Sequence, residues 1–96
     1  MAVQEISFTE LSNWIREGRD FVLIDVRESH EHYTRNIGGE LIPLSEINRR
    51  FRMPNPTKPV VFYCQKGIRS QIAIQRLHQK YPDSDFYNLK SGLASV

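Results

Sequence analysis

A predicted strand, a short loop and a predicted helix follow one another near the middle of the chain, and this order limits the possible folds. The apolar run 60–63, Val-Val-Phe-Tyr, is typical of a buried strand, and the amphipathic run 71–80 is typical of a helix. The chain's only cysteine, Cys64, stands where the strand should end. Gly67 then supplies a turn, and Arg69 lies close to where the helix should begin. We therefore expect an α/β unit with a cysteine at its strand-to-helix turn.

The place of Cys64 suits a nucleophile. Backbone N–H groups at the start of a helix lack partners within the helix and carry partial positive charge, so they stabilise an anion in front of them. A cysteine in such a place has a pKa lowered from about 8.5 to roughly 3.5–7.5, which makes it nucleophilic at neutral pH. The alternative is that Cys64 fills the core, because cysteine is among the most often buried residue types.

The two cations of the loop have simpler explanations as well. Arg69, five positions after Cys64, favours the nucleophile reading, but it could equally pair with a surface carboxylate. Lys66 is expected to be solvated. A buried core cysteine requires neither the glycine turn nor a nearby cation, so the combination favours a functional loop.

Short predicted strands alternate with predicted helices along the rest of the chain. Ser7 and Glu10 form a capping-box pattern for a helix that should stop at Gly18. The other predicted elements are strands at 4–6, 21–24, 40–42, 60–63 and 85–89, helices at 28–33, 44–51 and 71–80, and an irregular connection at 53–59. This alternation predicts a parallel sheet with helices on both faces.

Polar residues that follow the strand at 21–24 are expected near the same crevice as Cys64, because ligands gather at the carboxyl ends of parallel strands. For Asp25 and Arg27, a structural role as helix cap or ion pair is preferred over direct chemistry. His30 and His32 are two positions apart and point in different directions on a helix, so we expect no metal site.

Size and composition restrict the function further. The 96 residues suffice for one domain, spanning 1–96. A formal net charge of +2 gives no indication of nucleic-acid binding, and no apolar run approaches the roughly twenty residues of a membrane helix. The first residues lack a secretory signal, and a single free thiol suits a reducing compartment, so a cytoplasmic location is expected.

Three stretches together resemble the rhodanese domains, a family of sulfurtransferases. They are 23–28 (Leu-Ile-Asp-Val-Arg-Glu), 36–44 (Asn-Ile-Gly-Gly-Glu-Leu-Ile-Pro-Leu) and 60–70, the strand with its cysteine loop. The middle stretch is similar to rhodanese domains fused to the adenylyltransferases of molybdopterin and thiamine biosynthesis. The resemblance implies a three-layer fold with a mostly parallel sheet of four to five strands, helices on both faces, and a missing C-terminal helix. It also leaves open that the chain is a fragment of a longer protein.

The resemblance implies a role for each residue of the loop. Cys64 would carry sulfur as a persulfide, from a small anionic donor such as thiosulfate or from a cysteine desulfurase, to a thiophilic acceptor. The residues expected to hold the sulfur or the donor are Gln65, Lys66, Gly67, Ile68, Arg69 and Ser70. Lys66 and Arg69 would attract the anionic donor. No cofactor is implied, and a small sulfur-carrier protein or an adenylyltransferase domain is a possible partner.

Two other functions fit the same fold. A rhodanese-like module can dock a partner without catalysis, although the complete cysteine loop argues against this. Phosphatases of the same fold have, as the resemblance implies, a loop one residue longer that accommodates a phosphoryl group, whereas Cys64 to Arg69 spans six residues. The turn at Asn36 also lacks the histidine that many rhodanese domains place before the isoleucine.

Overall fold

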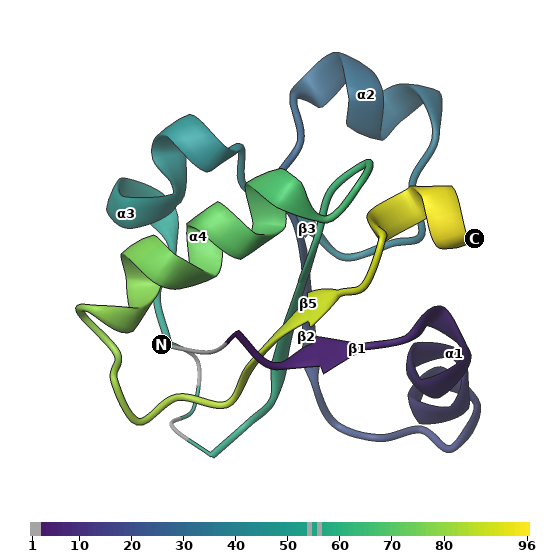
Figure 1. The fold of residues 1–96 in the computed structure, drawn as a ribbon, viewed down its shortest axis with the longest axis horizontal. Helices are drawn as coiled ribbons and strands as arrows, with labels where there is room; N and C mark the ends of the chain where they lie inside the picture. Colours follow the sequence, from purple (N-terminus) through teal and green to yellow (C-terminus); the bar gives the residue numbers. More distant parts are fainter. Residues whose placement is uncertain (1–2, 54, 56) are drawn as a thin grey trace.

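The computed structural model describes residues 3–53, 55 and 57–96, and it forms one layered α/β unit (Figure 1). The elements are β1 (Glu5–Ile6), α1 (Phe8–Arg16), β2 (Val22–Asp25), α2 (Ser29–Thr34), β3 (Glu40–Leu41), the 3₁₀ turn η1 (Leu44–Glu46), α3 (Ile47–Arg50), β4 (Val60–Tyr63), α4 (Ile68–His78), β5 (Phe86–Leu89) and the 3₁₀ turn η2 (Gly92–Ser95). The predicted irregular connection at 53–59 includes residues 54 and 56, which lie outside the described residues.

All five strands form one parallel sheet in the order β1-β5-β4-β2-β3. This confirms the predicted α/β class and the predicted number of strands. β4 is central, pairing with β2 from Val22↔Val60 to Asp25↔Tyr63 and with β5 from Val60↔Phe86 to Phe62↔Asn88. Because the strands are parallel, their carboxyl ends meet at one edge, where Asp25, Cys64 and the end of β5 come together.

The alternating side chains of β4 supply both hydrophobic cores. Val60 and Phe62 lie on the face covered by α3 and α4, and Val61 and Tyr63 on the face covered by α1 and η2. Figure 1 shows α3 and α4 together on one side of the sheet, α1 on the other, and α2 beyond the carboxyl ends of the strands. Helices cover both faces of the sheet, as predicted. A strand buried on both faces needs a continuous apolar sequence, and β4 (Val60–Tyr63) has one.

Local sequence signals account for most element boundaries. The Ser7–Glu10 capping box is present, with the Ser7 hydroxyl accepting from the Glu10 N–H at 3.1 Å, and Gly18 follows α1 with φ +68°. The predicted helix at 44–51 divides into η1 and α3, because Glu46 lies outside helical geometry at φ −112°. α4 starts at Ile68, three positions earlier than predicted.

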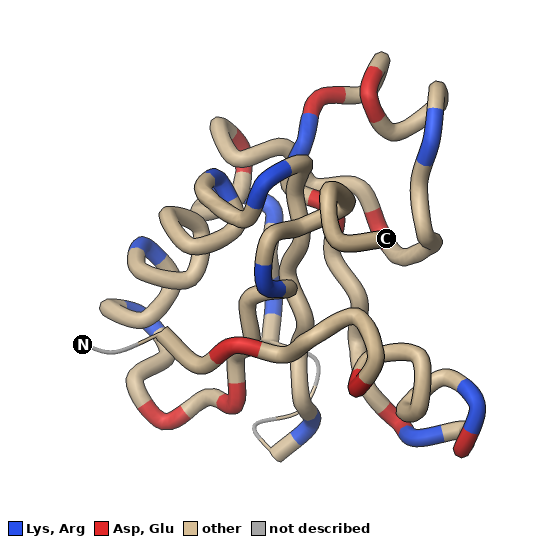
Figure 2. The backbone as a smooth tube through the Cα atoms, turned by 45° about the vertical axis from the view of Figure 1, so that its right-hand side comes forward, with Lys and Arg blue, Asp and Glu red and all other residues tan. Residues whose placement is uncertain are grey.

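The end of the chain, the distribution of charge and the length of the helices complete the description of the fold. After β5 the described residues form the 3₁₀ turn η2. Acidic and basic positions are interspersed along the chain (Figure 2). Within the described residues, no helix has the length and apolar character needed to span a membrane.

Candidate functional site

Cys64 lies directly after β4, with its Sγ turned into a ring of hydrogen-bond donors. Sγ accepts from the backbone N–H of Gly67 at 3.1 Å and of Ser70 at 3.5 Å, and it lies 3.3 Å from Ser70 Oγ. The residue is 1% exposed and belongs to the hydrophobic core on the α3–α4 face, so the expectation that it fills the core is met as well. Although Cys64 is buried, amides of the cysteine loop (residues 64–70) converge on its sulfur.

The loop depends on Gly67 for its shape. Gly67 is the N-cap residue of α4 and has φ +90°, a conformation that is strained for residues with a side chain. A Cβ at this position would also lie 3.3 Å from Ser91 N. The left-handed turn brings the first amides of α4 around the sulfur, so the macrodipole of an eleven-residue helix favours negative charge on Sγ.

The surroundings of Cys64 lower its pKa. The largest single influence, burial, raises the pKa, but hydrogen bonds from the Ser70 hydroxyl and from the backbone N–H groups of Ser70, Lys66 and Gly67 together outweigh it. Hydrogen bonds donated to the charged form favour the thiolate. The site therefore holds a sulfur that is both shielded from bulk water and stabilised as an anion.

Asn88 supports the loop from the neighbouring strand β5. Its Oδ1 accepts from Ser70 Oγ at 2.5 Å, its Nδ2 donates to the Gly67 carbonyl at 3.1 Å, and the residue is 2% exposed. Sequence reasoning did not single out Asn88. A signal was present, because a polar residue within the apolar run 86–89, on a strand predicted to lie in the same sheet, is expected near the loop.

The C-terminal turn η2 holds the other side of the cysteine loop. The Leu93 N–H donates to the Cys64 carbonyl and the Ala94 N–H to the Gln65 carbonyl, both at 3.0 Å. Gly92, at φ +55°, lies so close that a Cβ there would overlap the carbonyls of Cys64 and Gln65. The short segment after β5 is thus part of the site.

The remaining loop residues face outward. The Arg69 guanidinium forms a two-bond pair with the Glu31 carboxylate, Nη1 to Oε1 at 2.7 Å and Nη2 to Oε2 at 2.9 Å. Hydrogen bonding to Arg69 lowers the pKa of Glu31 to about 2, and the same pair raises the pKa of Arg69. Of the two roles weighed for Arg69, the ion pair is the one observed. Lys66 is exposed, and Ile68 is 65% exposed.

A pocket of about 360 Å³ gives access to this arrangement. It is lined by Glu31, Cys64, Gln65, Lys66, Ile68 and Arg69. A larger hollow of about 640 Å³ lies between α2, β3 and η1, but Cys64 does not line it. The smaller pocket, which Cys64 lines, is therefore the candidate site.

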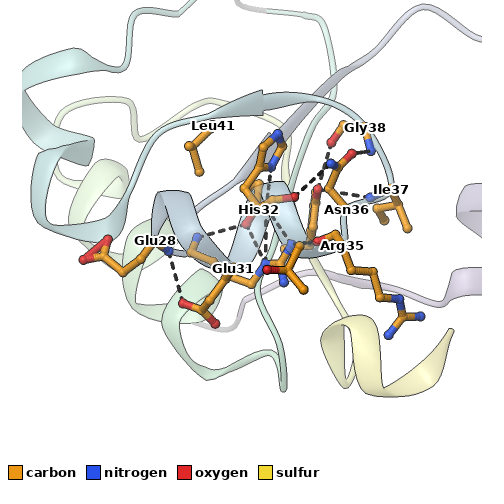
Figure 3. A network of polar contacts seen from close by, with 12 residues as sticks. Glu28, Glu31, His32, Arg35, Asn36, Ile37, Gly38 and Leu41 are labelled. Carbon is orange, nitrogen blue, oxygen red and sulfur yellow. Dashed lines mark hydrogen bonds and ion pairs between the residues drawn. The ribbon is translucent and has the colours of Figure 1, made fainter.

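Of the structural roles predicted for Asp25 and Arg27, the ion pair is the one observed. Asp25 is fully buried and accepts from Arg27 Nε at 3.0 Å and Nη2 at 2.9 Å, and its Oδ2 lies 2.8 Å from His32 Nδ1. Arg27 Nη2 also donates to the Arg35 carbonyl at 2.5 Å. Figure 3 shows this network around α2 and the turn that follows it, where Asn36 caps the His32 carbonyl. These contacts fix α2, and with it Glu31, over the carboxyl ends of the strands.

The histidines do not gather into a metal site. His32 is engaged by Asp25 through Nδ1, and residues 3–53, 55 and 57–96 contain no group of three or more His, Cys, Asp or Glu side chains placed to bind a metal.

Comparisons with known proteins agree with this geometry. The family model described as a rhodanese-like domain matches residues 7–96. The uncharacterized protein YqhL of Bacillus subtilis is 41% identical over 91 residues, which cover 93% of this chain and 71% of YqhL. The probable adenylyltransferase/sulfurtransferase MoeZ of Mycobacterium tuberculosis is 36% identical over 90 residues, covering 90% of this chain but only 22% of MoeZ.

A solved structure extends the likeness to the fold. The human single-domain sulfurtransferase TSTD1 superposes with a TM-score of 0.74 at 27% identity, covering 93% of this chain and 92% of that one. The match to the family model spans nearly the whole chain and includes the cysteine loop. The chain therefore belongs to the rhodanese-like domain family, which includes sulfurtransferases, as the resemblance of its three sequence stretches implied.

Proposed function

We propose that the protein is a sulfurtransferase that carries a sulfane sulfur as a persulfide on Cys64. The observation that carries this proposal is the convergence of two backbone amides and the Ser70 hydroxyl on Sγ. Such donors stabilise a negatively charged sulfur in the same way as an oxyanion hole stabilises an oxygen. Sulfurtransferases among the relatives and the lowered pKa of Cys64 support the same reading.

The reaction would proceed as a double displacement. The Cys64 thiolate attacks the sulfane sulfur of the donor, an S–S bond forms on Cys64, and the donor's remaining part leaves with the electron pair of the broken bond. The terminal persulfide sulfur then carries the negative charge. A thiophilic acceptor attacks that sulfur and releases the Cys64 thiolate, so the enzyme returns to its starting state without a metal or an organic cofactor.

The size of the loop favours sulfur over phosphate. Cys64 to Arg69 spans six residues, and Arg69, which would bind a phosphoryl group in a phosphatase of this fold, is paired with Glu31. A compact ring of amides fits one sulfur atom better than a tetrahedral phosphoryl group. We therefore place sulfur transfer ahead of phosphatase activity.

The partners follow from the same chemistry. The donor is a small anionic sulfur compound or the persulfide of a cysteine desulfurase, and the acceptor is a thiophile such as a small sulfur-carrier protein. We treat residues 1–96 as one cytoplasmic domain, which acts alone or beside an adenylyltransferase domain. The likeness to MoeZ supports the second arrangement.

The test is intact-mass measurement after incubation with thiosulfate or with a cysteine desulfurase and free cysteine. We expect the wild-type protein to gain one sulfur atom and Cys64→Ser to gain none. A wild-type protein that gains no sulfur from either donor would instead be a docking module. Turnover of an aryl phosphate would indicate a phosphatase.

A further inference from the structure

The Arg69 guanidinium is already occupied by a partner at the mouth of the pocket. Its two terminal nitrogens donate to the two oxygens of Glu31 at 2.7 and 2.9 Å, the parallel geometry that makes such pairs strong. Glu31 belongs to α2 and stands 38 positions earlier in the chain, yet both side chains line the pocket of Cys64. The pair therefore brings a cation and an anion to the entrance together, with almost no net charge.

The carboxylate of this pair opposes an anionic donor. The Glu31 side chain is 25% exposed, so solvent screens its charge only in part. Glu31 cancels most of the attraction that Arg69 alone would exert, and because each Coulomb energy is proportional to the donor's charge, a dianion such as thiosulfate loses twice as much of this attraction as a monoanion. A donor that binds Arg69 directly must first displace Glu31 from both nitrogens.

The rest of the rim fits a macromolecular surface. Ile68 lines the pocket and is 65% exposed, and an apolar side chain offers no favourable contact to a hydrated dianion. Lys66, also on the rim, forms no ion pair within the described part of the chain. An exposed aliphatic residue beside one cation is suited to contact with another protein.

We propose that Glu31 is a specificity-determining residue, which selects against small dianionic sulfur donors and in favour of a singly charged persulfide carried on a protein thiol. This inference rests on the proposed persulfide function of Cys64 and adds the class of donor. Glu31 acts by withholding Arg69 and by placing a negative charge beside the path to Sγ.

The two kinds of donor react by the same step. With a persulfide donor, the Cys64 thiolate takes the terminal sulfur and the donor thiolate leaves with the electron pair of the broken S–S bond. With thiosulfate, sulfite leaves with that pair instead. Neither reaction needs an external oxidant or reductant. Because the reaction at Sγ is shared, the ratio of the two rates isolates the effect of Glu31 on the donor.

The experiment measures the rate of sulfur addition to Cys64 in the wild-type protein and in Glu31→Gln, with thiosulfate or with a cysteine desulfurase supplied with free cysteine. Glutamine keeps an oxygen that accepts from Arg69 and from the Glu28 N–H while it removes the charge. We expect the second-order rate with thiosulfate to rise on the order of tenfold and the rate with the desulfurase persulfide to change by less than about twofold. Added salt should reduce the gain.

Glu46→Gln is the matched control. Glu46 also pairs with arginines, Arg49 at 2.9 Å and Arg50 at 3.2 Å, but it does not line the pocket of Cys64. Its variant should keep the wild-type ratio of thiosulfate to persulfide rates, and the double variant Glu31→Gln/Arg69→Gln should lose the gain. The rate ratio cancels any general damage to Cys64.

Two results would overturn the assignment: an unchanged ratio in Glu31→Gln, or an equal rise in Glu46→Gln. Failure of the proposed function looks different. In that case Cys64 of the wild-type protein gains sulfur from neither donor. If only the role of Glu31 is wrong, Cys64 still gains sulfur, and the ratio of the thiosulfate rate to the persulfide rate is the same in Glu31→Gln as in the wild type.

Discussion

Cys64 combines two opposing influences on one sulfur atom. Removing a thiolate from water disfavours the charge, but a hydrogen bond to a charged group contributes about 1.5–3 kcal/mol. The sulfur is surrounded by the amides of Gly67 and Ser70 and by the Ser70 hydroxyl. The combined effect of the hydrogen bonds to Cys64 on its pKa exceeds the effect of burial, so the pKa is lowered.

The Ser70 hydroxyl has one proton and two acceptors. It donates to Asn88 Oδ1 at 2.5 Å, and Sγ lies 3.3 Å away. While the Ser70 hydroxyl donates its proton to Asn88 Oδ1, its oxygen can only accept a hydrogen bond from the Cys64 thiol. When the thiol ionises, the hydroxyl must turn toward Sγ to stabilise the thiolate. The hydrogen bond of Ser70 is therefore expected to change with the charge of Cys64, and Asn88 holds the hydroxyl in place while Cys64 is a neutral thiol.

Ser70→Ala tests this role at the scale of a single side chain. Loss of the hydroxyl removes a donor that lowers the pKa of Cys64, so this pKa should rise. As the pH is lowered, Cys64 of the variant should become protonated at a higher pH than Cys64 of the wild type. We expect alkylation by iodoacetamide at neutral pH to slow about ten- to hundredfold, because one hydrogen bond of about 1.5–3 kcal/mol to the charged form is lost. The measurement is the alkylation rate as a function of pH.

Ser84→Ala serves as the control for this prediction. The Ser84 hydroxyl donates to the Tyr81 carbonyl at 2.6 Å and has no contact with Cys64. Its pH profile should match the wild type. A Ser70→Ala profile that also matches the wild type would mean that the backbone amides alone hold the thiolate.

At the scale of elements, the site is formed by a strand-to-helix turn and a strap across it. β4 and α4 bring Cys64 and the first amides of the helix together through Gly67. On the other side of the loop, N–H groups of η2 donate hydrogen bonds to the Cys64 and Gln65 carbonyls. The peptide group of the Gln65 carbonyl also carries the Lys66 N–H, one of the donors that lower the pKa of Cys64, so η2 helps to keep that donor directed at the sulfur.

Gly92→Ala should damage this strap. The position requires φ +55°, and a Cβ there would overlap the Cys64 and Gln65 carbonyls, so we expect a loss of about 2–4 kcal/mol in the free energy of unfolding. Gly18→Ala is the matched control, because Gly18 has φ +68° and nothing within 4 Å of its Cβ position. It should lose only about 1 kcal/mol. Urea unfolding measures both, and equal losses would exclude the overlap as the cause.

The sequence predicted what depends on neighbours along the chain. Alternating apolar runs, the Ser7–Glu10 capping box and the glycine after Cys64 are local signals, and the structure confirms the elements they predicted. The partners of the site are not local: Glu31 is 38 positions from Arg69, and Asn88 is 18 positions from Ser70. No periodicity specifies which carboxylate meets which guanidinium, so the pairing of Arg69 required the fold.

For the molecule as a whole, α2 is the part held mainly by polar contacts. None of its residues is fully buried, and it is fixed through the Asp25–Arg27–His32 network at one side and the Glu31–Arg69 pair at the other. The latter pair links α2 to α4, two elements far apart in sequence. The stability of the whole fold should therefore depend on the charge of Glu31.

That dependence has a definite sign. The pKa of Glu31 is lowered from 4.5 to about 2, chiefly by hydrogen bonding to Arg69. The charged form is favoured in the folded state, so the contribution to stability is fully present above the unfolded pKa of 4.5 and is lost as the pH falls toward about 2. Glu31→Gln lacks this component at every pH.

We therefore expect the free energy of unfolding of the wild-type protein to exceed that of Glu31→Gln by about 1 kcal/mol at neutral pH, which is the upper end for a partly exposed ion pair. The difference in the free energy of unfolding should narrow progressively as the pH is lowered from about 5 to about 2, when urea unfolding is measured across that range. Arg69→Gln should reproduce the narrowing, because it removes the other half of the pair. A gap that stays constant with pH would show that Glu31 stabilises α2 through its packing or its bond to the Glu28 N–H rather than through its charge, and the coupling between α2 and α4 would then have to come from other contacts.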